Sequence, residues 1–246
     1  MEINLKLDNV SLILGEGKLK LIHQINMTLE PGIHCLLGPN GSGKTLTNRM
    51  VSLIEKVTEG EIKLGDDKIN PWSNDETKLQ NIRKIGYMRQ QPIFLNDNVK
   101  NNILLPLKLR KVSKENQIRK INMVLDDYEL SDIAETNINE LSVGQQQKVA
   151  LARTMITEPE IVILDEPTNS LDMKNTRWFE DKIKLLIEKK SMIILWTSHD
   201  MNQVRRIAKY CSVIIEGEIR ESGLVVNIFE NAKDELVRAY LAGELI

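Results

Sequence analysis

The sequence has 246 residues, of which 41% are hydrophobic and 28% charged, and its formal net charge is −2 at pH 7. This composition is typical of a globular protein with one large core or two smaller ones, and the lack of a basic excess gives no reason to expect a nucleic-acid partner. No apolar stretch approaches the roughly eighteen residues of a membrane helix, and residues 1–6 lack the features of a secretion signal, so we expect a cytoplasmic protein.

Residues 1–30 alternate between apolar and polar side chains with intervening turns, which predicts an antiparallel β-layer. A Pro-Gly pair then leads into an apolar run, Ile33 to Leu37, that we expect to be a buried strand. Cys35 lies in this run and Cys211 in a similar one. Both cysteines are expected to be small buried residues rather than parts of a disulfide framework or a metal site.

The segment after this strand matches the phosphate-binding loop G-x-x-x-x-G-K-[ST] at every required position. Its residues are Gly38, Pro39, Asn40, Gly41, Ser42, Gly43, Lys44 and Thr45. Glycines allow backbone N–H groups to converge on phosphate oxygens, and the positive end of the helix that follows favours the anion. We expect Lys44 to bridge the β- and γ-phosphates and the Thr45 hydroxyl to bind Mg²⁺.

Further along, the pattern predicts a short strand at 60–64 and a surface loop at 66–78, with a helix starting near Asp75. Another strand passes through Tyr87. Since Pro92 disfavours a helical conformation in the residue before it, this strand should give way to a loop.

From residue 98 to 139 the pattern becomes helical. Several apolar side chains fall at spacings that line one helix face and are expected to pack into a core: Ile118, Ile121, Val124, Leu125 and Tyr128. The segment 99–110 mixes apolar and basic residues, as a membrane-surface helix would. Pro106 and the short length of the segment favour packing together with the docking of a partner helix instead.

The run Leu141 to Gln145 has the spacing of a capping box, because Ser142 can accept from the third helical N–H while Gln145 reaches back to the cap. Apolar residues at helical spacing follow. A helix that begins here would present free N–H groups and a positive dipole end to an anion.

An apolar, β-branched run, Ile161 to Leu164, ends in two carboxylates and predicts a buried parallel strand. After a phosphate loop, such a pair has divided roles. Asp165 would face Mg²⁺, and Glu166 would lie beside the γ-phosphate, where a carboxylate can orient or deprotonate the attacking water.

The run Leu-Ser-Val-Gly-Gln at 141–145 resembles the signature motif of ATP-binding cassette (ABC) ATPases, and the resemblance covers nearly the whole chain. It implies an α/β fold in which a P-loop NTPase (RecA-like) core carries an antiparallel β-layer and an inserted α-helical subdomain. It also implies that Ser142, Gly144 and Gln145 complete the phosphate site of the opposite subunit. Two copies would then form a homodimer around two ATP and two Mg²⁺.

On this resemblance, residues 1–246 form a single ABC ATPase domain. Its parts are the β-layer within about 1–30, the nucleotide-binding α/β core at 31–90 and 151–224, the helical subdomain with the signature motif at 91–150, and a C-terminal helix at 225–246.

Three further positions resemble the family individually. Gln90 is similar to the glutamine that contacts Mg²⁺ and water and relays the nucleotide state to a membrane partner, with Gln91 as the alternative. His199 resembles the switch histidine that contacts the γ-phosphate, and Asp172 the carboxylate of a loop that crosses the dimer interface. The catalytic set implied by the resemblance is Glu166, His199, Lys44 and Gln90, and the metal set is Thr45, Gln90 and Asp165.

Two positions depart from the family pattern. Val143 replaces a common glycine, and valine would be strained there only if the backbone needed a positive φ. Leu14 stands where the family usually places an aromatic residue that stacks on adenine. An aliphatic contact lacks the stacking free energy of about 1–3 kcal/mol per base, so we expect loose selectivity between ATP and GTP.

The final part of the chain predicts a helix at 202–210, a pair of strands at 211–215 and 218–221, and a helix from about Val225. Residues 229–244 resemble the tail of importer ATPases for small polar solutes and oxyanions.

The resemblance implies an ATPase that drives a separate integral membrane permease, on the inner face of the membrane, with import favoured and the solute open. It allows an extracytoplasmic solute-binding protein as a further partner. One alternative is a soluble ABC ATPase of translation or DNA repair, although such proteins usually carry tandem cassettes or long insertions. An inactive cassette is the other, and it would be expected to have lost Lys44, Asp165 or Glu166.

Overall fold

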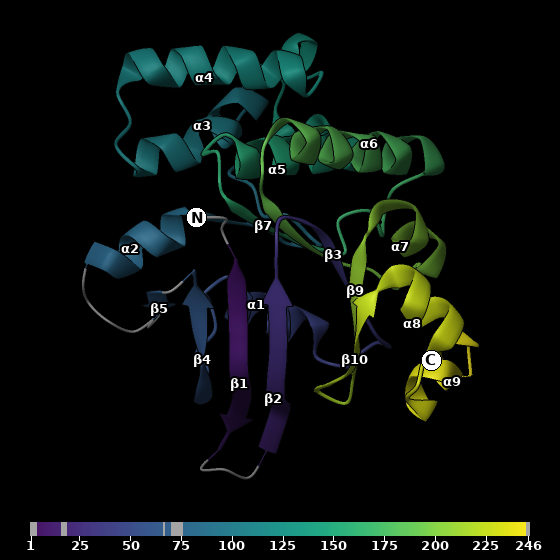
Figure 1. Ribbon diagram of the computed structural model, residues 1–246. Helices are drawn as coiled ribbons and strands as arrows, with labels where there is room; N and C mark the ends of the chain where they lie inside the picture. Colours follow the sequence, from purple (N-terminus) through teal and green to yellow (C-terminus); the bar gives the residue numbers. More distant parts are fainter. Residues whose placement is uncertain (1–3, 16–18, 66, 70–75, 245–246) are drawn as a thin grey trace.

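The computed structural model describes residues 4–15, 19–65, 67–69 and 76–244. Two sheets and the helices packed on them make up the described chain (Figure 1). Its strands are β1 (Leu5–Leu14), β2 (Leu19–Leu29), β3 (Gly32–Leu37), β4 (Glu59–Leu64), β5 (Asp67–Ile69), β6 (Ile85–Met88), β7 (Ile161–Asp165), β8 (Ile193–Thr197), β9 (Tyr210–Ile215) and β10 (Glu218–Leu224). Its α-helices are α1 (Lys44–Val51), α2 (Glu76–Arg83), α3 (Val99–Leu109), α4 (Lys114–Asp127), α5 (Val143–Met155), α6 (Met173–Lys189), α7 (Met201–Ile207), α8 (Val225–Asn231) and α9 (Glu235–Leu241).

The first sheet is the antiparallel layer that the N-terminal pattern predicts. Its strand order is β2-β1-β4-β5, so β4 and β5 extend the pair formed by the first two strands. The second sheet has the order β10-β9-β3-β8-β7-β6. Strands β9, β3, β8, β7 and β6 run parallel, and β10 adds an antiparallel edge.

The parallel strands of the larger sheet are largely buried on both faces, which explains why they read as mostly continuous apolar runs, whereas the edge strand β10 is polar and partly exposed. In β7, Ile161 and Ile163 pack with the antiparallel layer and α1, whereas Val162 and Leu164 pack with the helices on the opposite face. This alternation is the two-residue period of a strand placed between two cores. Because parallel strands end at one edge of a sheet, the residues after β3, β7 and β8 are brought close together.

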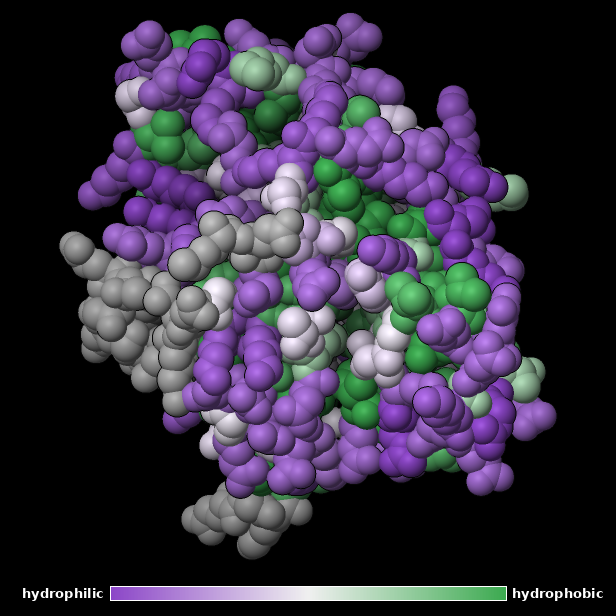
Figure 2. All heavy atoms as spheres, viewed as in Figure 1, coloured by the Kyte–Doolittle hydropathy of each residue, from purple (hydrophilic) through white to green (hydrophobic). Residues whose placement is uncertain are grey.

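Helices α3, α4 and α5 lie together at the top of Figure 1, on the side away from the antiparallel strands. On the face that Figure 2 shows, hydrophilic side chains cover most of the surface and apolar ones appear in separate patches. Among the residues that the structure describes, no helix is both long and apolar enough to span a bilayer.

Two predictions about helices need correction. Ile118 was expected on the buried face of its helix, but it is 62% exposed at the edge of that face, whereas Ile121 and Leu125 are buried as predicted. The expected single helix from Val225 is two helices: the backbone leaves the helical conformation at Ala232, and Asp234 caps α9 by accepting from two backbone N–H groups. Residues 245–246 of that predicted helix lie outside the described residues.

Other boundaries differ by a few residues. The helix expected at 202–210 is α7, which ends at Ile207, and β10 continues to Leu224. The loop expected at 66–78 contains the short strand β5, while positions 66 and 70–75, including Asp75, lie outside the described residues. Strand β6 ends at Met88 before a loop, as the position of Pro92 predicts.

The two cysteines are free and buried, as predicted. Cys35 on β3 is the register partner of Cys211 on β9, so the two thiols are neighbours inside the helix-facing core. Burial raises the pKa of the Cys35 thiol well above its usual range and that of Cys211 to about 12.

We expect neither thiol to react with a disulfide reagent such as DTNB at pH 8 in the folded protein. The reactive form of cysteine is the thiolate, and burial keeps both thiols protonated at that pH. Absorbance at 412 nm should show two equivalents of thiol after denaturation and almost none before. A full equivalent that reacts rapidly in the native protein would contradict this description of the core.

Candidate ATP-binding and hydrolysis site

The phosphate loop connects β3 to α1, at the edge where the parallel strands end. Packing within the protein requires glycine at two positions of this loop, in addition to the space that a bound phosphate would need. A Cβ on Gly38 would overlap the backbone carbonyl of Ile214, and one on Gly43, whose φ is 107°, would come within 2.6 Å of the Ile22 side chain. The loop is thus wedged against β9 and the antiparallel layer, which fixes its shape.

Lys44 is buried at the first position of α1. Its Nζ donates to the carbonyl oxygens of Gly38, at 2.8 Å, and Pro39, at 3.0 Å, and lies 3.8 Å from Oε1 of Glu166. Burial lowers the pKa of Lys44, and the nearby carboxylates of Glu166 and Asp165 oppose that shift. The ammonium is therefore held inside the curve of the loop, where it can bind phosphate.

Asp165, at the end of β7, is only 3% exposed and accepts hydrogen bonds from three secondary-structure elements. Its Oδ1 accepts from Asn48 and Thr197, each at 2.9 Å, and from Thr45 at 3.4 Å. Its Oδ2 accepts from the Tyr87 hydroxyl at 3.1 Å. Burial, followed by the charge of Asp165, raises the pKa of Tyr87 well above its usual range, so the hydroxyl stays protonated as a donor.

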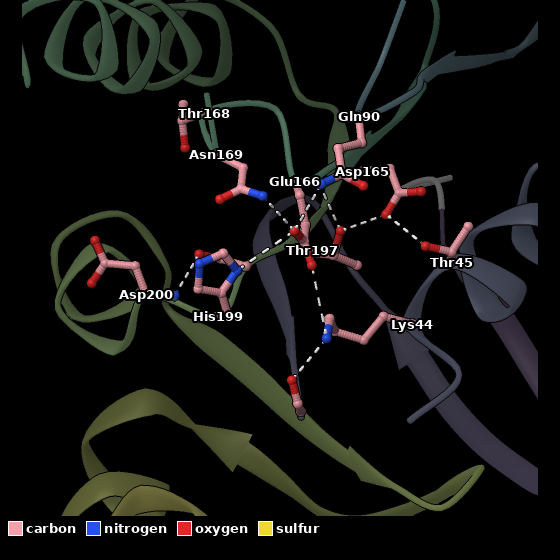
Figure 3. A network of polar contacts seen from close by, with 12 residues as sticks. Lys44, Thr45, Gln90, Asp165, Glu166, Thr168, Asn169, Thr197, His199 and Asp200 are labelled. Atoms are coloured by element: carbon pink, nitrogen blue, oxygen red, sulfur yellow. Dashed lines mark hydrogen bonds and ion pairs between the residues drawn. The ribbon is translucent and has the colours of Figure 1, made fainter. Parts of the chain in front are cut away.

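Glu166 has a left-handed backbone, with φ of 44°, a conformation that is rare outside glycine and is often found at functional sites. Its N–H donates to Thr197 Oγ1 at 2.9 Å. Its Oε2 accepts from Gln90 and Asn169, each at 3.3 Å, and lies 3.5 Å from Nδ1 of His199 (Figure 3). The carboxylate therefore lies between the loops that follow β6, β7 and β8.

These side chains surround one cavity of about 570 Å³, lined by Asn40, Gly41, Gly43, Lys44, Thr45, Leu46, Gln90, Glu166, Asn169 and His199. The four residues predicted as catalytic all lie on it. A neighbouring cavity is lined by Thr45, Gln90 and Asp165 among others. A hydroxyl, an amide and a carboxylate offer the oxygen ligands that Mg²⁺ takes alongside phosphate oxygens and water, so this donor set fits Mg²⁺.

The capping box predicted at the start of the signature helix is present in the structure. Ser142 caps α5, with Gln145 N–H donating to Ser142 Oγ at 3.3 Å and Ser142 N–H donating to Gln145 Oε1 at 2.9 Å. The residues that line the phosphate-loop cavity include none of Ser142, Gly144 and Gln145. Within one copy of the chain, the structure does not bring these residues to that loop.

Gly144 and Asp172 are connected through one side chain. A Cβ on Gly144 would come within 2.7 Å of the Asn175 amide nitrogen, and that amide donates to both carboxylate oxygens of Asp172 at 3.1 Å. Asp172 also caps α6 by accepting from Asn175 N–H at 2.8 Å. The start of α5 is therefore packed on the start of α6, and this packing alone is a reason for glycine at position 144.

The structure gives the surroundings of three positions that the sequence left open. Val143 lies in the first turn of α5 and has no positive φ, so valine brings no backbone strain. Gln90, not Gln91, donates to Glu166. Leu14 is 47% exposed at the end of β1, so its side chain is not used in the core.

Sequence reasoning did not predict the contacts of four residues that hold the site of one copy together: Asn48, Tyr87, Asn169 and Thr197. Two signals were present. Asn48 lies one helical turn after Thr45 and so faces the same way. Thr197 is the last residue of the strand that precedes His199, and strand ends are where parallel sheets place polar site residues.

A phosphate loop after β3, a buried acid at the end of β7, with β8 between these two strands, and a second acid beside the loop lysine define a nucleotide-binding P-loop protein. Comparison with known proteins narrows the class. The model of the ABC transporter family matches residues 22–169, more than half of the sequence. The chain belongs to the ABC transporter family.

Relatives with assigned roles are found among import proteins. The methionine import ATP-binding protein MetN of Photobacterium profundum is 34% identical over 94% of this chain, which spans 67% of that protein. A probable anion import ATP-binding protein of Haloferax volcanii is 29% identical over 94% of this chain and 85% of its own length. The chain therefore spans about two thirds of the length of the MetN relative.

Solved structures agree with the fold. The dimeric structure of MJ0796, a bacterial ABC transporter cassette, superposes with a TM-score of 0.81 at 27% identity, over 90% of this chain and 98% of that one. A post-hydrolysis state of the same cassette, bound to ADP and Pi, gives a TM-score of 0.80 at 28% identity. The predicted α/β P-loop NTPase fold is confirmed.

We expect Thr197→Val to lower the free energy of unfolding by about 1–3 kcal/mol. Thr197 is fully buried, and the change leaves the Glu166 N–H without an acceptor and removes one hydrogen bond to Asp165. Urea titration measures the loss. Thr157→Val is the matched control, since the Thr157 hydroxyl makes only a 3.5 Å contact with Thr154 O, and it should change little. Equal stabilities for the two variants would contradict the role given to Thr197.

Proposed function

We propose that the chain is the ATP-hydrolysing subunit of an ABC importer and that it works as a homodimer on a separate membrane permease. The observation that carries the proposal is the position of Glu166. Its carboxylate lies 3.8 Å from the phosphate-loop lysine and 3.5 Å from His199, on the cavity that the loop itself lines. A carboxylate in that position faces both the γ-phosphate and the water that attacks it.

Each side chain then has a defined part. Lys44 binds the β- and γ-phosphates, with the loop N–H groups around it. Thr45, Asp165 and Gln90 would hold Mg²⁺, which when bound neutralises charge on the β- and γ-phosphate oxygens. Glu166 orients the water and takes its proton. His199, whose Nδ1 faces the same carboxylate, contacts the γ-phosphate.

The signature residues and Asp172 act on a second copy of the chain. Ser142 is exposed at the start of α5, whose first N–H groups and positive dipole end can bind an anion. Since the cavity beside Lys44 in the same copy is lined by other residues, the γ-phosphate of an opposing copy is the natural target. The cassette structure that superposes on this chain is dimeric, which supports the assembly of two copies.

A groove beside Gln90 suits the permease. It lies between β6, α3 and α5, and is lined by Tyr87, Arg89, Pro92, Ile93, Pro106, Arg110 and Arg153 among others. Ile93 is 67% exposed there, and Arg153 Nη1 donates a hydrogen bond to the Ile93 carbonyl oxygen at 2.8 Å. An apolar helix end with acidic or carbonyl groups would fit this mixed surface. Such docking would place the protein on the inner face of the membrane.

Import is favoured because the relatives named above are import proteins. The solute would be selected by the permease and by an extracytoplasmic solute-binding protein rather than by this chain. The alternative is a soluble ABC ATPase of translation or DNA repair. The net charge of −2 gives no support for nucleic-acid binding.

We expect Glu166→Gln to bind ATP normally while its hydrolysis rate falls about 100-fold or more, because an amide keeps the shape of the carboxylate but cannot take a proton. ATP should then hold the variant as a dimer, measured by light scattering with and without ATP. Glu216→Gln is the matched control, since Glu216 is exposed and also has a left-handed backbone, with φ of 51°. Unchanged hydrolysis in Glu166→Gln would remove Glu166 from its proposed role.

The partner can be tested with the same variant. In ATP and mild detergent, Glu166→Gln should co-purify with a polytopic membrane protein, identified by mass spectrometry. Adding Ile93→Asp should abolish this association while ATP-dependent dimerisation persists, because Ile93 lies in the groove and outside the nucleotide cavity. Ribosomes or DNA in place of a permease would support the soluble alternative.

A further inference from the structure

A buried glutamine on α7 connects the two loops that carry Glu166 and His199. Gln203 is only 2% exposed. Its Nε2 donates to Thr168 Oγ1 at 3.0 Å and to Glu180 Oε1 at 3.1 Å, and its Oε1 accepts from the Ser198 hydroxyl at 2.9 Å. Both amide hydrogens and the amide oxygen are therefore used, which fixes the orientation of the side chain.

This amide is anchored by a charged pair. Glu180, on α6, is 1% exposed and accepts from Arg206 Nη2 at 2.8 Å and from Arg206 Nε at 3.3 Å. Two-point bonds between a guanidinium and a carboxylate are strong and directional. The carboxylate in turn fixes which end of the Gln203 amide faces it, because only the NH₂ group can donate to Glu180.

The two groups that Gln203 holds are next to the residues of the hydrolysis site. Thr168 lies two residues after Glu166, and Ser198 directly precedes His199. Ser198 Oγ also accepts from Asp200 N–H at 3.0 Å, so the turn around His199 is bonded on both sides. Gln203 thus forms a bridge, buried in the protein, between the loop after β7 and the loop after β8.

We propose that Gln203 is a positioning residue for ATP hydrolysis: it sets the separation of Glu166 and His199 without touching the nucleotide. This inference rests on the proposed hydrolysis at the same site. Displacements of about 1 Å at a reacting centre can cost roughly 100-fold in rate. A side chain that holds both loops from behind therefore affects the chemical step. Gln203 makes no hydrogen bond to the phosphate loop, so ATP binding should not depend on it.

Gln203→Met tests the inference, because methionine has a similar length and can make none of these three hydrogen bonds. In steady-state assays of the full chain, kcat should fall about 10- to 100-fold while KM for ATP changes less than about twofold. Gln117→Met is the matched control. This substitution on α4 also removes a hydrogen bond, the one that Gln117 Nε2 donates to Val112 O at 2.7 Å. The control variant should leave kcat unchanged.

Two smaller changes keep the test decisive if Gln203→Met folds poorly. Thr168→Val and Ser198→Ala each remove one end of the bridge, and each should lower kcat with little change in KM. Combined with Gln203→Met, either one should add less than its own separate effect, because all three side chains belong to one network.

A kcat for Gln203→Met that matches Gln117→Met, a rise in KM with unchanged kcat, or fully additive losses would overturn the inference alone. The inference would also be overturned if Gln203→Met and Gln117→Met each lost kcat in proportion to their loss of Tm, because general destabilisation would then explain the loss. If the unaltered chain fails to hydrolyse ATP, or Glu166→Gln hydrolyses it fully, the proposed function fails and this inference with it. Activity of those two proteins is therefore measured first.

Discussion

The buried carboxylate of Asp165 is the constraint on which the rest of the site depends. A charge this far from water is stable only when neighbouring groups donate to it, and the donors here come from α1, β6 and β8. Satisfying one anion therefore fixes the start of the phosphate-loop helix, the strand that leads to Gln90 and the strand that leads to His199. The arrangement of the candidate site follows from a requirement of folding, before any nucleotide is considered.

Local signals predict much of this structure and fail at identifiable places. The apolar runs and the phosphate loop could be predicted because strand burial and close backbone approach leave direct marks on residue choice. Ile118 was placed wrongly because spacing gives the direction of a helix face but not its width. Asn48 and Thr197 were missed because they meet across 149 positions of sequence. Contacts of that range depend on how whole strands are ordered.

The two helix starts that we propose to act on a second copy of the chain also pack against each other. The helix that Ser142 caps and the helix that Asp172 caps meet at Gly144 and Asn175, so the two surfaces are in direct contact. Behind the site, Gln203 connects the following loops. The first connection is a close packing contact, whereas the second uses an amide that donates and accepts at once. These contacts add to the hydrogen bonds that Asp165 accepts within the site.

The contacts of Lys44 have a consequence for how nucleotide is exchanged. Its ammonium donates to the carbonyl oxygens of Gly38 and Pro39, so a phosphate that arrives takes the place of partners supplied by the loop itself. A cation that loses every partner in such a buried position would be costly, and those carbonyls are ready to accept it again as phosphate departs. Product phosphate can thus leave without a stage at which the lysine has no hydrogen-bond partner. The net affinity of the site for phosphate reflects the difference between the lysine's hydrogen bonds to phosphate and those to the loop.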